Sequence, residues 1–285
     1  MISASNEICR AQPLLGTIVE IRVAVEKESI TFQAIHKAFA AIQRVHDHMS
    51  FHDPRSDISK LNREGHRRPI RVDPWTREVL KKAVKLSQQT NGLFDMTVAP
   101  KLVRWGFLPK IEDGVRRPLA GAWRHVYFEK DGKVGFLKPL LIDLGGIAKG
   151  FAVDRAVDTL QNFGVKAGLV NAGGDMRVFG NREMPVLIRD PNSPRQRFHR
   201  FTLYSEALAT SGNYFTYHHY RGQKVFPLVH PKTLQPCRCK SITVAAPECW
   251  LADGLTKVVA VEGEKKEKKS SHLKKFGARV VFYSR

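Results

Sequence analysis

Hydrophobic residues recur along this chain with two different spacings, which predict both strands and helices. Residues 16–26 (GTIVEIRVAVE) alternate polar and apolar positions, as a strand with one buried face does. Residues 32–49 carry apolar side chains at helical spacing. A further helix is predicted over residues 73–92, because Pro74 stands in its first turn and Gly92 just past its end.

Shorter elements are predicted after each of these helices. Residues 50–62 predict a loop that runs into a short helix, with Ser56 or Asp57 as its N-cap. Residues 126–137 predict a hairpin, because the Asp-Gly pair in the middle favours a tight turn. Strands and helices therefore follow one another from the beginning of the chain.

The stretch LLIDLGGIAKGFAVDRAVDTL (residues 140–160) predicts a strand, a turn and a helix in succession. Its apolar start predicts a buried strand, which breaks at Gly145 and Gly146. The helix that follows is predicted to end near residues 162–164. Glycines at such a turn often let the backbone close on a phosphate, but this spacing matches neither the dinucleotide-binding fingerprint nor the P-loop.

The remaining chain predicts several further strands and one more helix. Residues 167–180 predict two strands around a glycine break, and residues 184–191 and 199–212 predict more strands. Residues 241–261 join a strand to a helix that begins near Trp250. Because strands and helices mix without a regular βαβ rhythm, we predict an α+β fold, with residues 1–285 in one large domain of mixed sheets and flanking helices.

Length and composition support a globular protein. The chain has 285 residues, which is long enough for a sizeable core. Hydrophobic residues make up 42% of it and charged residues 26%, as is typical of a globular protein. No stretch approaches the ~20 apolar residues of a membrane span. The first residues have no basic start and no apolar run, and Cys9 has no apolar run before it, so neither a signal peptide nor a lipid-anchor site is predicted. We expect a cytoplasmic protein.

The formal net charge of +20 raises the possibility of a nucleic-acid partner. Basic residues gather in residues 63–71 and 262–275, but neither cluster interleaves aromatic residues, as a base-stacking surface would. We therefore favour solvated loops, and keep nucleic-acid binding as the weaker alternative.

The four cysteines are too few for a disulfide scaffold in a chain of this length. Cys237 and Cys239 lie one residue apart, with histidines not far upstream. This spacing matches no standard zinc pattern. Loop cysteines are the favoured interpretation and a zinc site is the alternative.

Four segments share a distinctive chemistry: a strand that ends in small residues with an Asp close by. They are IDLGGIAKG, VNAGGD, LATSGN and LADGLTK. Their glycines let backbone N–H groups approach an anion, and Asp143, Asp175 and Asp253 are suited to hold a divalent cation or a ligand's hydrogen-bond donors. Any one of them alone also fits a tight turn or a helix cap. Together they indicate a phosphate-rich ligand.

These segments, with others in the same order, resemble the ApbE family of FAD:protein FMN transferases. The others are LLGTIVEIRV, MSFHDPRSDISKLN and GLFDMTVAPKLVRWGF, and the family motifs span residues 12–262, followed by a basic C-terminal segment, 263–285. The resemblance implies a protein that binds FAD, cleaves its pyrophosphate with Mg²⁺ and attaches FMN through a phosphoester to a Thr or Ser of an acceptor flavoprotein, releasing AMP.

The resemblance also implies which residues form the site. Those expected to bind the flavin nucleotide are Leu15, His52, Leu93, Phe94, Asp95, Asp143, Lys149 and Val229. The metal is expected on the carbonyl of Gly146 and on Asp253, which is also the expected catalytic residue. A structural role is the alternative for three of them: Phe94 also fits a core side chain, Lys149 a charge on a helix surface, and Asp253 a helix cap.

The chain departs from the family pattern at its metal site. Four residues after Asp253, where the family has a Thr ligand, stands Lys257, which cannot bind a metal while protonated. Its ammonium group is suited to take the cation's place and pair with Asp253 and a phosphate. Pro227 and His230 replace a family His and Asp. Beside the weaker alternative of nucleic-acid binding, two hypotheses therefore remain: an active transferase, or a paralogue that binds FAD without transferring FMN.

Overall fold

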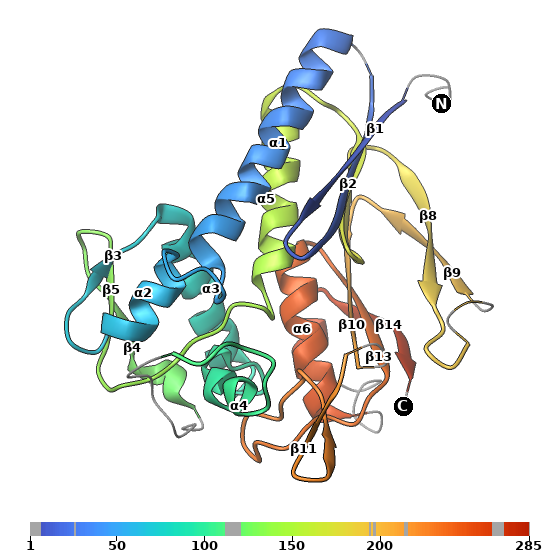
Figure 1. The fold of residues 1–285 in the computed structure, drawn as a ribbon. Helices are drawn as coiled ribbons and strands as arrows, with labels where there is room; N and C mark the ends of the chain where they lie inside the picture. Colours follow the sequence, from blue (N-terminus) through green and yellow to red (C-terminus); the bar gives the residue numbers. More distant parts are fainter. Residues whose placement is uncertain are drawn as a thin grey trace.

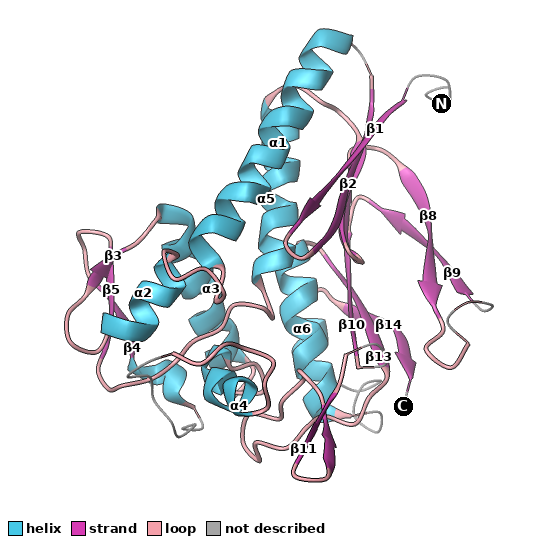
Figure 2. Ribbon diagram, viewed as in Figure 1, coloured by secondary structure: helices cyan, strands magenta, loops and turns pink. Residues whose placement is uncertain are grey.

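A computed structural model describes residues 7–25, 27–111, 121–193, 195, 198–213, 216–263 and 271–284. Its centre is a seven-stranded sheet in the order β1-β2-β6-β7-β10-β13-β14, with neighbouring strands antiparallel. The strands are β1 (Glu7–Leu14), β2 (Thr17–Ala24), β6 (Gly168–Ala172), β7 (Asp175–Phe179), β10 (Ala207–Gly212), β13 (Ser241–Ala246) and β14 (Arg279–Ser284). Helices and strands thus combine in one domain, which confirms the predicted α+β class (Figures 1 and 2).

The sheet is covered on both faces. The long helices α1 (Glu28–Met49), α5 (Ala148–Asn162) and α6 (Cys249–Glu262) pack along one face, and the hairpin of β8 (Glu183–Arg189) and β9 (Phe198–Tyr204) lies beyond the other (Figure 1). This cover explains two burial patterns. Every residue of β13 is buried, whereas alternate residues of β8 are buried. A strand covered on both faces has no solvent side, whereas an outer hairpin keeps one.

Smaller elements surround the end of this layer where α5 begins. They are α2 (Asp57–Glu64), β3 (Ile70–Arg71), α3 (Pro74–Gln89), the 3-10 turns η1 (Met96–Val98) and η2 (Ala122–His125), α4 (Ala99–Arg104), β4 (Val126–Phe128), β5 (Lys133–Phe136), β11 (His218–Tyr220) and β12 (Gln223–Val225). The short helix α8 (Ser271–Lys275) stands between α6 and β14 in the chain. No helix within the described ranges has both the length and the apolar composition to cross a bilayer.

Most of the predicted elements are confirmed. Ser56 caps α2 by accepting the backbone N–H of Ser59, while Asp57 accepts hydrogen bonds from Asp73 and Thr76. The hairpin β4–β5 forms around its Asp-Gly turn, and α6 begins next to Trp250. The first helix begins at residue 28 rather than 32, and β1 and α4 were not predicted.

The buried strand predicted at residue 140 is wrong. Residues 139–144 form no regular element and pair with no described strand. Instead the side chain of Asn62 accepts the N–H of Ile142 at 2.8 Å and donates to its C=O at 2.9 Å, and Asp143 donates its backbone N–H to Met96. A buried amide side chain can satisfy both backbone groups of one residue, so this segment needs no neighbouring strand.

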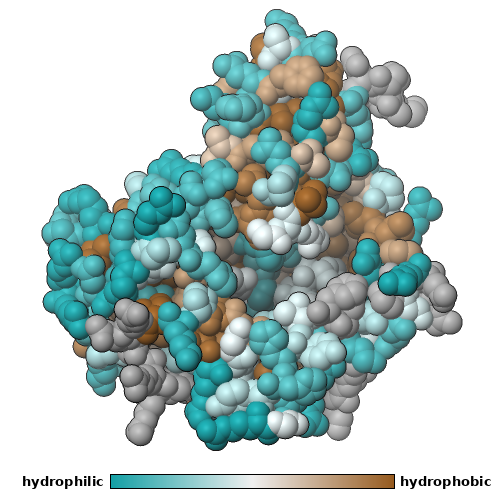
Figure 3. Space-filling view, viewed as in Figure 1, coloured by the Kyte–Doolittle hydropathy of each residue, from teal (hydrophilic) through white to brown (hydrophobic). Residues whose placement is uncertain are grey.

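The basic C-terminal segment contributes to the core sheet. β14 pairs with β13, and Leu273 of α8 is buried. Of the basic cluster predicted at 262–275, residues 264–270 lie outside the described residues. The surface in Figure 3 is largely hydrophilic, with a hollow near its centre below α1.

Candidate active site

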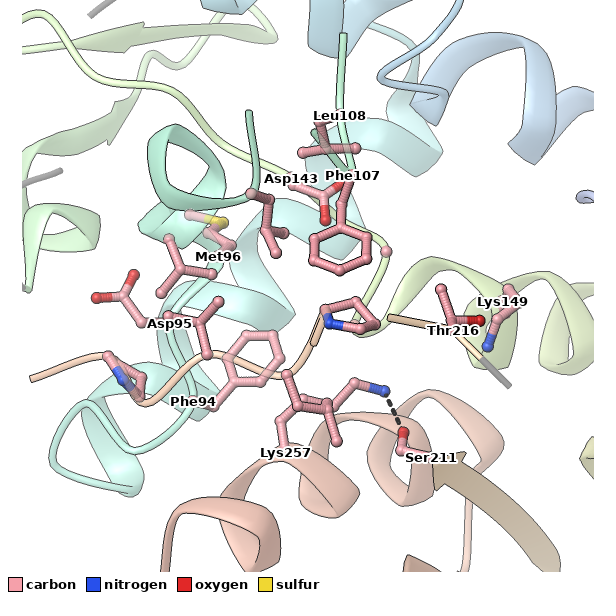
Figure 4. A pocket seen from close by; sticks show the side chains of 18 of the residues that line it. Phe94, Asp95, Met96, Phe107, Leu108, Asp143, Lys149, Ser211, Thr216 and Lys257 are labelled. Atoms are coloured by element: carbon pink, nitrogen blue, oxygen red, sulfur yellow. Dashed lines mark hydrogen bonds between the residues drawn. The ribbon is translucent and has the colours of Figure 1, made fainter. Parts of the chain in front are cut away.

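A cavity of about 410 Å³ opens where α5 and α6 meet the small elements (Figure 4). Its residues come from the loop after α3, from η1, from α4 and the loop after it, from the glycine turn and the start of α5, from the end of β10 and the loop after it, from the loop after β12, and from α6. They are Leu93, Phe94, Asp95, Met96, Val98, Leu102, Phe107, Leu108, Asp143, Gly145, Gly146, Lys149, Thr210, Ser211, Gly212, Thr216, Pro227, Leu228, Val229, Pro231 and Lys257.

One wall of the cavity is the glycine turn that precedes α5. A Cβ atom on Gly145 would lie 2.9 Å from Oδ2 of Asp143, and one on Gly146 would lie 3.2 Å from Cε of Lys257. Side chains at these positions would crowd both groups, so the turn keeps its backbone open to the cavity. Burial raises the pKa of the Asp143 carboxyl, against the lowering effect of the Gly145 N–H, His52 and Lys257.

A second wall carries the ion pair between Lys149 of α5 and Asp175 of β7. The Nζ of Lys149 donates a hydrogen bond to Oδ2 of Asp175, whose side chain is only 2% exposed. The other carboxylate oxygen, Oδ1, accepts the N–H of Thr210 at 3.3 Å. Burial lowers the pKa of Lys149, but the Asp175 carboxylate outweighs it and the pKa ends above its usual value. The ammonium group therefore stays charged at the cavity.

The floor of the cavity is a second ion pair, inside α6. The Nζ of Lys257 donates to Oδ1 of the buried Asp253 and, at 2.9 Å, to Oγ of Ser211 (Figure 4). Oδ2 of Asp253 accepts the N–H of Gly150 at 3.3 Å. Burial raises the pKa of Asp253, but the Lys257 and Lys149 ammonium groups outweigh it, so the pKa ends below its usual value. The carboxylate is ionised and both of its oxygens are engaged.

Thr256 does not replace the missing metal ligand. Its hydroxyl donates to the backbone carbonyl of Asp253 at 2.6 Å and hydrogen-bonds to Ser211 at 2.7 Å. In a helix it lies about 100° around the axis from position 257. Its oxygen is therefore part of the support beneath Lys257.

These residues do not fit a divalent cation between Gly146 and Asp253. Within the described ranges, no three His, Cys, Asp or Glu side chains gather as a metal would require. The Lys257 ammonium already occupies Oδ1 of Asp253. A divalent ion about 4 Å from this ammonium would be repelled by about 8 kcal/mol at an effective dielectric of about 20.

The structure brings most of the predicted site residues together. Leu93, Phe94, Asp143, Lys149 and Val229 line the cavity with Gly146, and Asp253 lies directly below Lys257. Leu15 instead forms the turn of the β1–β2 hairpin, with φ of 55°, and lines a separate hollow beside Gln43 and His46. His52 is exposed and is absent from the lining, although it lies near enough to Asp143 to influence its pKa.

Asp95 borders the cavity but directs its carboxylate elsewhere. Oδ1 accepts hydrogen bonds from the backbone N–H and the hydroxyl of Thr97 at 2.8 and 2.6 Å, and Oδ2 accepts the N–H of Gly121 at 3.1 Å. In Figure 4 this carboxylate points away from Lys257 and Ser211. Asp95 therefore shapes the cavity by capping η1.

Sequence reasoning missed much of the apolar lining and the role of Ser211. Phe107, Leu108 and Pro231 come from loops without regular periodicity, so no spacing marks them as neighbours. Ser211 stands in the LATSGN segment, whose small residues are a usable signal. Only tertiary packing, in which β10 pairs with β7 and lies against α6, places Ser211 beside Lys257 and near the Lys149–Asp175 pair.

The zinc alternative for Cys237 and Cys239 finds no support in the described part of the chain. Both thiols are buried, and burial raises the pKa of each to about 12. A protonated thiol is neither a good ligand nor a nucleophile.

We expect iodoacetamide at pH 8 to alkylate the exposed Cys9 while Cys237, Cys239 and Cys249 remain unmodified until the protein is unfolded. Mass spectrometry of the native protein and of the protein in urea checks this. Labelling of Cys237 or Cys239 in the native state at the rate of Cys9 would contradict the buried position.

The fold and the cavity together define an α+β protein with an open glycine turn and two lysine–aspartate pairs at one ligand cavity. The ApbE family model matches residues 15–281. An FAD:protein FMN transferase of Vibrio cholerae is 30% identical over 281 residues, covering 92% of this chain and 83% of that protein. The chain therefore belongs to the ApbE family.

Solved structures agree with this assignment. The ApbE protein of Thermotoga maritima superposes with a TM-score of 0.80 at 28% identity, covering 97% of this chain and 94% of that one. The flavin transferase ApbE of Vibrio cholerae superposes with a TM-score of 0.72 at 25% identity, covering 93% and 91%. The predicted family and fold are confirmed.

Proposed function

We propose that this protein is an FAD:protein FMN transferase. The observation that carries the proposal is the cavity itself, in which the open backbone of the glycine turn and the ammonium groups of Lys149 and Lys257 face the same space. Phosphoryl transfer depends on positioned positive charge around the phosphoryl oxygens. The names of the relatives point to the same reaction.

The proposed reaction joins the FMN half of FAD to a protein. The oxygen of an acceptor Thr or Ser forms a bond to the phosphorus of the FMN half, the bond to the AMP phosphate breaks, the hydroxyl proton is released, and AMP leaves. Lys149 and Lys257 neutralise charge on the diphosphate, and the backbone N–H groups of the glycine turn approach its oxygens. Apolar side chains such as Phe94 and Phe107 exclude water from the remainder of the nucleotide.

The family resemblance implies Mg²⁺, but Gly146, Asp253 and Lys257 do not form a ligand set that fits it. The proposed reaction therefore includes no step on the metal. The partner is an acceptor flavoprotein with an accessible Thr or Ser. The +20 charge also raised nucleic-acid binding, but none of the reported relatives carries such a name.

Incubation of the purified protein with FAD and candidate acceptor proteins tests this function. We expect an acceptor that keeps its flavin fluorescence in a denaturing gel, a phosphoester-linked FMN on a Thr or Ser by mass spectrometry, and AMP released in equal amount. The matched control replaces that Thr or Ser by Val or Ala. FAD binding without any AMP or flavinylated acceptor would instead favour the paralogue that binds FAD without transfer.

A further inference from the structure

Two buried carboxylates, Asp175 and Asp253, lie behind the lysines that line the cavity, and each is paired with one of them. Asp175 is paired with Lys149 from the neighbouring helix, and Asp253 is paired with Lys257 one turn along α6. The two carboxylate side chains are 2% and 1% exposed, while their lysines are 35% and 21% exposed. The carboxylates therefore form the buried base of the site, and the ammonium groups form its surface.

The support below Lys257 holds its ammonium group in one place. Asp253 accepts the N–H of Gly150 from α5, and Ser211 is held by Thr256 while it accepts a hydrogen bond from Lys257. An ionised carboxylate that lost its lysine would be left unpaired in the interior, which is strongly unfavourable. The ammonium group therefore remains on Asp253 whether or not the cavity holds a ligand.

The same group keeps one donor for a ligand. An ammonium has three N–H bonds, of which one goes to Asp253 and one to Ser211. Lys257 lines the cavity beside Gly146, whose missing side chain leaves room for the lysine stem at 3.2 Å. The third donor and the positive charge are thus available to an anionic oxygen in the cavity.

We propose that the ammonium group of Lys257 binds the diphosphate of FAD in the place of a divalent cation, so that this protein binds FAD without one. The inference rests on the proposed function for the identity of the ligand. It gives the Asp253–Lys257–Ser211 unit a binding role: Asp253 and Ser211 position the ammonium group, and Lys257 contacts the phosphate oxygens.

Equilibrium binding of FAD tests the proposal, measured by isothermal titration in EDTA and again in excess Mg²⁺. We expect the dissociation constant of the native protein to agree within about threefold between the two conditions. Lys257→Met keeps the stem and removes the charge, and should weaken binding by about tenfold to a hundredfold, the range for a charge-assisted hydrogen bond. Lys85→Met is the matched control, because Lys85 is exposed on α3 and absent from the cavity.

A second variant tests whether Mg²⁺ can take the place of the Lys257 ammonium group. Lys257→Thr should bind FAD weakly in EDTA and regain affinity in Mg²⁺, because Asp253 is then free of its lysine. Thermal unfolding of each variant confirms that it is folded. Should Lys257→Met not fold, the native protein and Lys257→Thr still provide the comparison of EDTA with Mg²⁺.

Two results would overturn the proposal. One is tenfold or greater tightening of FAD binding to the native protein by Mg²⁺, and the other is unchanged affinity in folded Lys257→Met. If FMN transfer also occurs but only with Mg²⁺, the proposed function stands and this inference alone fails. If the native protein binds no FAD in either condition, the proposed function fails together with it.

Discussion

Gly150→Ala should lower the free energy of unfolding by about 3 kcal/mol, the upper end of overpacking costs in a filled interior. A Cβ at Gly150 would lie 2.3 Å from the carbonyl oxygen of Cys249 and 2.7 Å from the backbone N of Trp250. These atoms belong to the first turn of α6 and cannot rotate aside. Alanine in a helix would otherwise stabilise by about 1 kcal/mol, so the sign of the change is informative.

The same substitution should weaken FAD binding. The N–H of Gly150 donates to Asp253, and a displaced α6 carries Asp253 and Lys257 away from the glycine turn. Urea unfolding and FAD titration measure the two effects. Gly254→Ala is the control, because its Cβ would meet the end of the Leu86 side chain, at 2.5 Å, rather than backbone. Equal destabilisation by both variants would show that the close backbone contact between Gly150 and α6 does not cause the loss of stability.

Lys149→Met should cost about 3 to 5 kcal/mol of stability, as when one partner of a buried ion pair is removed. Asp175, whose side chain is 2% exposed, keeps the hydrogen bond from Thr210 but loses its ion pair, and only the weaker attraction of the Lys257 ammonium remains. FAD affinity should also fall, because Lys149 lines the cavity. Thermal and urea unfolding with FAD titration provide the measurements.

A double-mutant cycle separates the two roles of Lys149. Lys149→Met with Asp175→Asn removes both charges, and should recover more than half of the lost stability without restoring FAD affinity. Simple addition of the two single-variant losses would show that Lys149 and Asp175 are not coupled. Recovery of affinity with stability would show that Lys149 acts on the fold and not on the ligand.

Local sequence patterns were sufficient to predict a contact where the two interacting groups are neighbours along the chain. The sequence predicts Ser56 or Asp57 as the N-cap of α2, and the structure shows Ser56, because a cap bonds only three residues ahead. The pairing of Asp253 with Lys257 follows in the same way from a spacing of four in a helix. The strand expected at residue 140 failed because its backbone partner is the side chain of Asn62, eighty residues away.

The sequence by itself determined the family, the α+β class, the open glycine turn and the lysine that stands at the expected metal position. Tertiary structure alone decided that Lys149 of α5 pairs with Asp175 of β7, that Asp95 turns its carboxylate to Thr97, and that Leu15 lies in a separate hollow. The physical reason is that hydrogen bonds and ion pairs of low sequence separation follow from backbone geometry, whereas contacts across the sheet and helix layers depend on how the whole chain packs.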